Sequence, residues 1–197
     1  MTQLRRSFAL FLLTFVMSST AFAESESQFH IRIGAIKAVY WGSDSGDFFV
    51  PTMLDLEYET FLSNTRSLIF RSMLAMELET AKPYYAYSGA GMRYYLGSKG
   101  MLVESQGEGV AISAIPKVRY YIGWDAGISQ AIIQSLGRIL TVTSTMIDFG
   151  GNAGVIYQVD RKFGVEFHAG ATSAQGFSSV SVVGVTVRAT AGITYQF

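Results

Sequence analysis

The sequence predicts an all-β protein, a closed antiparallel transmembrane β-barrel with eight strands, with ten strands as the alternative. Three observations lead to this prediction: an alternating segment at the C-terminus, further alternating segments separated by turn residues, and an export signal at the N-terminus. Closure follows from the environment. In hydrocarbon every backbone N–H and C=O needs a partner within the protein, and a sheet provides this only when it has no edge.

The C-terminal segment, residues 180–197, alternates between apolar and polar or small residues with period two. The apolar parity consists of Val183, Val185, Val187, Ala189, Ala191, Ile193, Tyr195 and Phe197. Alternation over this length exceeds the five to six residues of an ordinary strand and is long enough to cross a bilayer at a tilt. The segment therefore predicts a spanning strand with one face toward lipid and the other toward the barrel interior.

The N-terminus carries the marks of a secretory signal peptide. Arg5 and Arg6 precede an apolar stretch over residues 8–17, and Ala21-Phe22-Ala23 follows as a small-residue cleavage site. We expect residues 1–23 to be cleaved, which leaves residues 24–197 as one barrel domain. Cleavage removes two of the 15 basic residues and none of the 15 acidic ones, so the net charge is about −2. This balance gives no basic surface for nucleic acid, and the absence of cysteine excludes disulfides and thiol chemistry.

Seven further alternating segments precede the C-terminal one. They cover approximately residues 28–40, 50–62, 66–78, 84–96, 110–128, 139–159 and 163–171. Turns at 63–65, 97–109 and 160–162 fall at one end of the predicted barrel, and loops at 42–49, 79–83, 130–138 and 172–178 fall at the other. With the signal and the C-terminus at the end of the first set, both termini are expected in the periplasm, and the outer loops are short.

The connection between the fourth and fifth strands is extended. A hairpin centred near Gly107 and Glu108 would bring the tyrosine pairs at 94–95 and 120–121 level with each other, with residues 101–115 as a periplasmic extension. Pro116 cannot donate to a ladder, which suits a strand start or break at that point. Residues 101–105 are too short to cross a bilayer, which favours eight strands over ten.

Ionisable residues follow the inward parity of the predicted strands. The set comprises Arg32, Asp55, Glu57, Glu59, Arg71, Glu77, Arg93, Lys117, Arg119, Asp125, Glu166, His168 and Arg188. A hairpin near residues 64–65 would place Arg71 across from Glu57 or Glu59, and one near residue 82 would place Arg93 beside Arg71. Arg119 would lie on the next strand, which makes one patch of these five residues.

Two interpretations of the interior stay open. Charges removed from bulk water need partners, so a mutually paired network that fills the lumen is the favoured one. Its members are Glu57, Glu59, Arg71, Arg93, Arg119, Glu166, His168 and Arg188. The alternative is a small-solute site, or an ion path that opens when the pairs rearrange.

The sequence does not favour catalysis. After the signal only His30 and His168 remain as histidines, and His30 has no acid nearby in the sequence. Glu166 and His168 share a face, but residue 170 is Gly, so a deacylase-like His-x-Ser pattern is absent. No metal-ligand spacing or phosphate-binding glycine loop is present. We therefore expect no enzyme activity, no cofactor and no metal, and expect His168 to be a satisfied lumen residue.

The signal peptide, the alternation and the Tyr195-Gln196-Phe197 end resemble the small bacterial outer-membrane β-barrels, the OmpA-type transmembrane domain and OmpX-like proteins. The resemblance implies a Gram-negative outer-membrane location in contact with lipid and lipopolysaccharide. It also implies that Tyr195 and Phe197 act as an assembly signal for the barrel-assembly machinery. A non-enzymatic, envelope-stabilising or partner-contacting function is the leading hypothesis. A porin-like narrow channel or small-solute-binding barrel is the second, and a lipid-modifying enzyme the third.

Overall fold

The computed structural model describes residues 27–42, 46–79, 82–96, 103–107, 110–114, 116–134, 141–177 and 182–197. The predicted signal peptide, residues 1–23, lies outside these ranges and stays a prediction, as do residues 97–102 and 108–109 of the predicted turn at 97–109 and the loop positions 135–138. Across the described ranges, no helix is long and apolar enough to cross a membrane.

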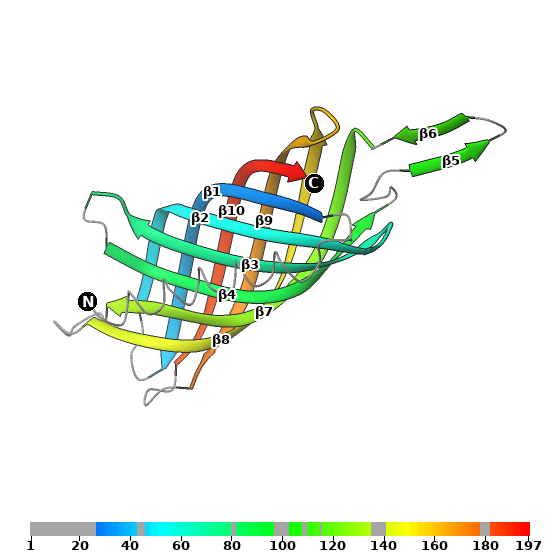
Figure 1. Ribbon diagram of the computed structural model, residues 1–197. Helices are drawn as coiled ribbons and strands as arrows, with labels where there is room; N and C mark the ends of the chain where they lie inside the picture. The colour runs from blue at the N-terminus through cyan, green and yellow to red at the C-terminus, as the bar shows by residue number, and fades with distance from the viewer. Residues whose placement is uncertain are drawn as a thin grey trace.

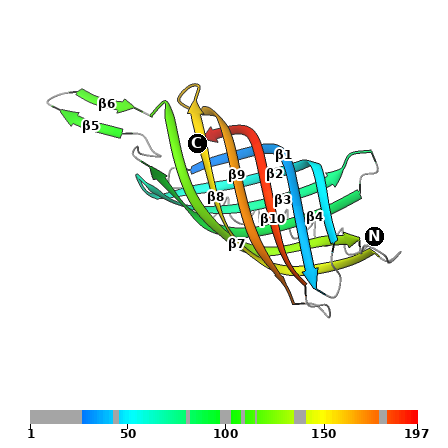
Figure 2. The ribbon, with the colours of Figure 1, turned by 180° about the vertical axis from the view of Figure 1, so that it is seen from behind.

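Eight long strands close into an antiparallel barrel, as Figures 1 and 2 show from opposite sides. They are β1 Ser27–Gly42, β2 Gly46–Ser63, β3 Arg66–Glu77, β4 Lys82–Leu96, β7 Val118–Gln134, β8 Thr141–Gln158, β9 Phe163–Gly176 and β10 Val182–Gln196. Around the barrel the order is β1-β10-β9-β8-β7-β4-β3-β2, and β1 pairs with both β2 and β10. The prediction of eight strands is confirmed, and the ten-strand alternative is wrong.

A separate two-stranded hairpin, β5 Val103–Gly107 with β6 Val110–Ala114, connects β4 to β7. It projects from the end of the barrel at which the C-terminus lies (Figure 1). The expected extended connection is therefore confirmed, and Tyr95 pairs with Tyr121 as the hairpin predicted. The predicted start of the fifth spanning strand, at residue 110, was wrong. The spanning strand begins at Val118, because Pro116 has no N–H to donate to the ladder.

The strands extend further toward the opposite end than their sequence patterns suggested. The loop expected at 172–178 belongs to β9 as far as Gly176, and β7 continues through Gln134 into the loop expected at 130–138. In β9 the alternation simply persists, with Thr172 and Ala174 buried between exposed neighbours. Connections of residues 43–45, 78–81, 135–140 and 177–181 remain, so the loops at this end are short, as predicted. That they face outside the cell stays a prediction.

Ser27 at the start of β1 and Phe197 after β10 lie at one end of the barrel, and we call them the termini of the barrel. At this end, β8 and β9 are joined by the predicted turn at 160–162. The side chain of Asp160 accepts hydrogen bonds from the backbone N–H groups of Lys162 at 2.7 Å and Phe163 at 2.8 Å. These two donors stabilise the ionised carboxylate and hold the pKa of Asp160 below its ordinary value. The turn is a local Asx-type device that fixes the β8–β9 register.

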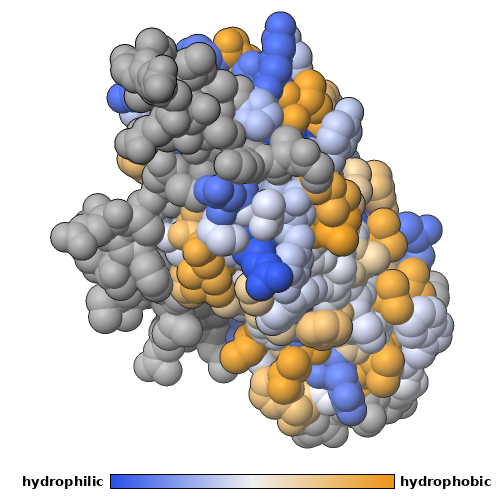
Figure 3. All heavy atoms as spheres, turned by 90° about the vertical axis from the view of Figure 1, so that its right-hand side faces the viewer, coloured by the Kyte–Doolittle hydropathy of each residue, from blue (hydrophilic) through white to orange (hydrophobic). Residues whose placement is uncertain are grey.

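The outer wall is apolar, because one parity of each strand points away from the interior. Ile33 is 68% exposed, Phe149 61% and Phe167 60%. Orange apolar groups recur along the flank of the barrel in Figure 3. A surface this rich in exposed large apolar side chains matches a protein whose solvent is hydrocarbon.

The interior has two halves. On β1 one inward parity continues from His30 and Arg32 to Ile36, Ala38 and Tyr40, so the change from charged to apolar is a change of residue type. On β2 the register shift opposite Gly34 and Ile36 inverts the parity, so Val50 also points inward. The half of the lumen remote from the termini is an apolar cluster. It consists of Ile36, Ala38, Tyr40, Val50, Met53, Met73, Ala75, Tyr85, Tyr87, Ala131, Met146, Ala174 and Val182. The half near the termini holds most of the buried ionisable residues, whereas Asp148 lies beside the apolar cluster.

Candidate functional site: the charged lumen

Glu57 is the centre of the lumen network. Its β2 position pairs in register with Arg71 on β3 and with His30 on β1. Glu57 Oε2 accepts from Arg32 Nη2 at 2.9 Å and from Arg71 Nε at 2.9 Å. Arg71 Nη2 and Arg93 Nη2 also donate to this carboxylate. Three guanidinium groups thus share one fully buried carboxylate.

A second centre is His30, whose ring lies between two carboxylates. Nε2 is 2.9 Å from Glu59 Oε2, and Nδ1 is 2.8 Å from Glu166 Oε2. An ionised carboxylate only accepts hydrogen bonds, so these two contacts need two protons among the three groups. His30 has no acid nearby in the sequence, but the fold gives it two. Its partners come from β2 and β9, which barrel closure brings to β1.

The third centre is Asp125 on β7. Its Oδ2 accepts from Arg71 Nη1, Arg188 Nη2 and Asn152 Nδ2, each at 2.8 Å. Its Oδ1 accepts from the hydroxyl of Tyr87 at 3.0 Å. Arg71 therefore joins Asp125 to Glu57 across the lumen.

Tyrosines form a layer between the ion pairs. The guanidinium carbon of Arg93 lies 3.8 Å from the centre of the Tyr121 ring, a cation–π contact. The hydroxyl of Tyr121 donates to Glu166 and lies 2.8 Å from Nδ1 of His168. The Tyr95 hydroxyl is 2.9 Å from Glu59 Oε1.

The structure brings most of the sequence-predicted residues together but not as one patch. Arg119 lies near the terminal end, where its Nη2 donates to Gln158 Oε1 at 2.8 Å and is 3.4 Å from Gln28 Oε1. Arg93 does not lie opposite Arg71; it pairs in register with Ser67, because the β3–β4 turn is centred nearer residue 80 than 82. The long side chain of Arg93 nevertheless brings its guanidinium group to Glu57.

Two residues expected to point inward do not. Lys117 is exposed in the bend before β7, with Nζ 5.5 Å from the Tyr157 ring centre. Glu77 is exposed because it is the last residue of β3 and lies beyond Ala75, where the described pairing with β2 ends. Both errors come from extending a period-two pattern beyond the regular ladder.

Sequence reasoning also passed over Asp148. This buried residue lies in β8 between the outward-facing Ile147 and Phe149, so the alternation itself was the available signal. Its carboxylate accepts from Tyr85 at 2.5 Å and from Ser129 at 2.8 Å.

Among the described residues, buried carboxylates and guanidinium groups nearly balance. The six acids are Asp55, Glu57, Glu59, Asp125, Asp148 and Glu166, and the five arginines are Arg32, Arg71, Arg93, Arg119 and Arg188. Such near-neutrality is what burial of many charges requires, since an uncompensated charge is strongly destabilising. With the charges nearly balanced, the lumen has little net charge that would attract a mobile ion.

One group has metal-ligand geometry. Ligand atoms of His30, Glu57 and Glu59 lie within 4.8 Å of one another. The same carboxylates already bind the guanidinium groups of Arg71 and Arg93. A cation at this point would be repelled by these positive charges, so the donors present fit an ion-pair network better than a metal centre.

A closed eight-stranded antiparallel barrel with an apolar outer wall and a filled interior is the architecture of the small outer-membrane β-barrels. Comparison with solved structures agrees. The chain is similar to neisserial surface protein A (NspA), with a TM-score of 0.55 and 16% identity over 86% of this chain and 97% of that one. At this identity the likeness shows the fold.

Two other matches are more distant. The N-terminal β-barrel domain of Pseudomonas aeruginosa OprF has a TM-score of 0.48 and 13% identity, covering 88% of this chain and all of that one (100%). Ail, the attachment invasion locus protein of Yersinia pestis, has a TM-score of 0.45 and 17% identity, covering 87% and 99%. No protein-family model matches the chain, and no curated protein matches it in sequence.

Proposed function

We propose that this protein is a non-enzymatic integral protein of the bacterial outer membrane with a sealed lumen, which stabilises the envelope or contacts an envelope partner. The observation that carries the proposal is the two-part filling of the barrel: an ion-pair network near the termini and an apolar cluster beyond it. In this proposal both termini and the β5–β6 hairpin face the periplasm.

The charged half is closed by side chains that cross it. Arg32 extends from β1 to Glu57 on β2 and, through Nη1 at 2.9 Å, to Glu166 on β9. Arg71 joins β2 to β7 through Glu57 and Asp125. An eight-stranded barrel is only wide enough for its own side chains, so these bridges occupy the cross-section.

The apolar half opposes ions for a different reason. Ile36, Met53 and Met73 are almost completely buried there, and the buried carboxylate of Asp148 already accepts hydrogen bonds from Tyr85 and Ser129. A passing ion would lose its hydration shell and gain few polar partners. The two barriers are in series. This arrangement supports a structural role over conduction.

Contacts with the envelope follow from the outside of the barrel. The apolar wall suits membrane lipid and lipopolysaccharide. The rings of Phe163, Tyr195 and Phe197 pack in sequence with centroids 5.0 and 5.1 Å apart at the end of the closing strand. In this proposal Tyr195 and Phe197 serve the barrel-assembly machinery and then anchor the barrel at the interface.

Planar-bilayer recording tests the sealed lumen. We expect the refolded protein to give no discrete current steps. Glu57→Ala and Arg93→Ala should either leave the current unchanged or raise the steady background current. Discrete wild-type openings that either substitution abolishes would refute the proposal. For the absence of enzyme activity, we expect identical lipid A mass spectra from a deletion strain and an overexpressing strain.

A small-solute-binding barrel is the second candidate, favoured by one observation. Several buried polar atoms on β8, β9 and β10 make no hydrogen bond within the protein: Asn152 Oδ1, His168 Nε2, Arg188 Nη1 and Thr190 Oγ1. Together they offer donors and acceptors to a small polar molecule. Liposome swelling with neutral solutes tests whether the barrel also lets such a molecule pass. Uptake that Arg188→Met slows and the surface substitution Arg66→Met does not would support a small-solute channel, and no uptake would remove that channel.

A further inference from the structure

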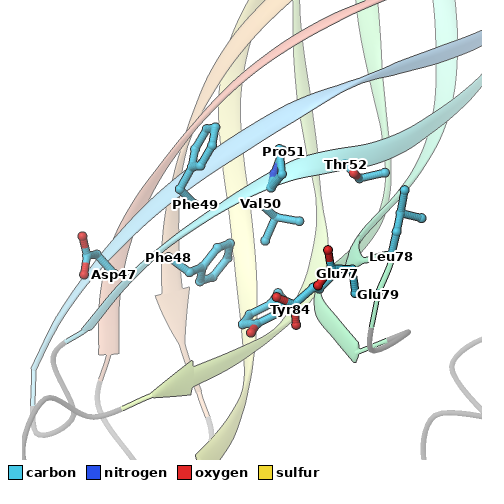
Figure 4. A pocket seen from close by; sticks show the side chains of 10 residues that line it. All are labelled: Asp47, Phe48, Phe49, Val50, Pro51, Thr52, Glu77, Leu78, Glu79 and Tyr84. Carbon is cyan, nitrogen blue, oxygen red and sulfur yellow. The ribbon is translucent and has the colours of Figure 1, made fainter.

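The barrel wall has a lateral opening at the end remote from the termini. β2 begins at Gly46, but its described pairing with β3 reaches only Met53, opposite Ala75. Residues 46–50 of this part of β2 pair with β1. A cavity of about 520 Å³ lies between this segment and the ends of β3 and β4 (Figure 4).

Two register shifts make the opening. Pro51 and Thr52 lie at the β1–β2 bulge, and Tyr84 is the extra residue at the shift between β3 and β4. All three line the cavity. Bulges bend strands and re-aim side chains, and they recur at barrel rims and beside functional sites. Pro51 also removes an N–H that the interrupted ladder would otherwise leave without a strand partner.

The cavity walls are aromatic and aliphatic. Phe48, Val50 and Tyr84 lie between the strands in Figure 4, whereas Phe49 extends from the other face of β2. The rings of Phe48 and Tyr84 are 6.0 Å apart, and Phe48 is 5.9 Å from the ring of Tyr40 in the apolar cluster. Because Phe48 and Tyr84 pack against that cluster, the cavity has an apolar floor continuous with the filled lumen.

The charged side chains that line the cavity, within the part of the chain that the structure describes, are all carboxylates: Asp47, Glu77 and Glu79. Asp47 and Glu79 are exposed at the rim, and Glu77 pairs in register with Lys82. An apolar interior with a negative rim selects for a ligand that is apolar at one end and positively charged at the other. Aromatic faces add cation–π attraction for the same charge.

We propose that this opening binds a small amphipathic cation, an organic ammonium ion with an aromatic or branched aliphatic body. The body packs against Phe48 and Tyr84, and the charge faces the carboxylate rim. A volume of about 520 Å³ falls within the usual range for small-molecule sites and is too small for a folded partner. A lipid acyl chain would gain nothing from the three acids. The site is independent of the lumen and of its conductance.

The experiment uses the full barrel refolded in non-ionic micelles, with benzyltrimethylammonium as the probe and benzenesulfonate as the anionic control. Amide chemical shifts in NMR titrations report both affinity and location. We expect shifts confined to residues 46–53 and the facing ends of β3 and β4. The double variant Asp47→Asn/Glu79→Gln is expected to weaken binding about threefold to tenfold, and Tyr84→Leu by about fivefold.

Asp160→Asn is the matched control, because it removes one carboxylate charge from an exposed turn at the opposite end. We expect it to leave the affinity unchanged, and added salt to weaken the wild type toward the double variant. Three outcomes would each overturn the proposal: equal binding of the sulfonate, unchanged affinity in Asp47→Asn/Glu79→Gln, or shifts spread along the lipid-facing wall. Because the probe does not enter the lumen, none of these outcomes bears on the sealed barrel, which conductance tests separately.

Discussion

Glu57→Gln should be the most destabilising charge removal in the lumen, because three guanidinium groups converge on this carboxylate. At an effective dielectric constant of about 20, each pair near 4 Å is worth roughly 4 kcal/mol before solvation is counted. Water and neighbouring acids offset much of this loss. Breaking a buried pair while its partners remain typically costs about 3–5 kcal/mol, and we expect Glu57→Gln to fall in that range. Arg71→Met removes one of the three partners and should cost less.

The test is a double-mutant cycle in denaturant titrations of the barrel in lipid vesicles, followed by tryptophan fluorescence and the heat-modifiable gel shift. The Glu57→Gln/Arg71→Met double variant should be less destabilised than the sum of the single variants by about 1–3 kcal/mol, because each substitution relieves the charge that the other leaves unpaired. Arg66→Met, on the exposed start of β3, is the control and should change stability by under about 0.5 kcal/mol. Additivity within about 0.5 kcal/mol would refute the shared network.

Three further predictions concern other parts of the barrel. Gly192→Ala should destabilise by about 1–3 kcal/mol, because a Cβ there would lie 2.0 Å from a backbone oxygen of β1, whereas Gly151→Ala, whose Cβ would meet nothing within 3.8 Å, should be tolerated in the same titrations. Folding lowers the pKa of Asp160, so this residue stabilises the folded state above its unfolded pKa, and that contribution is lost as the pH falls through the lower folded pKa. Asp160→Ala should therefore flatten the pH dependence of the unfolding free energy below about pH 4. An unchanged pH profile would contradict this cause. Phe197→Ala should slow insertion into vesicles more than it lowers final stability, because it removes an edge contact with Tyr195 at the end of the closing strand; a change in stability alone would count against an assembly role.

The barrel was predictable because lipid imposes a strict period. In β10 the exposed Val185 and Val187 flank the buried Thr186, and Arg188 is buried in turn, as the alternation predicted. The turn at 64–65 narrowed the partner of Arg71 to Glu57 or Glu59, and the register shift between Phe61 and Ser63 makes it Glu57. Local turns and the alternation of inward and outward residues thus made most of the fold predictable.

The rest depended on breaks in that period and on closure. The bulge near Pro51 inverts the parity of β2, so Val50 points inward although parity carried back from Glu57 would place it outward. His30 finds Glu166 only because β1 and β9 flank β10, a proximity that no local pattern encodes. The lateral opening near Pro51 likewise arises from two register shifts acting together.

The β5–β6 hairpin has a consequence for how the barrel folds. Pairing β4 with β7 requires closing a connection from residue 97 to 117, and the entropy cost of such a loop grows with its length. A β-hairpin forms within about microseconds and holds residues 103 and 114 together, so only the short connections of residues 97–102 and 115–117 remain to be closed. The pairing of β1 with β10 joins opposite ends of the chain, and no local hairpin shortens the loop between them. We therefore expect folding to start in the middle of the chain and the seam to form last.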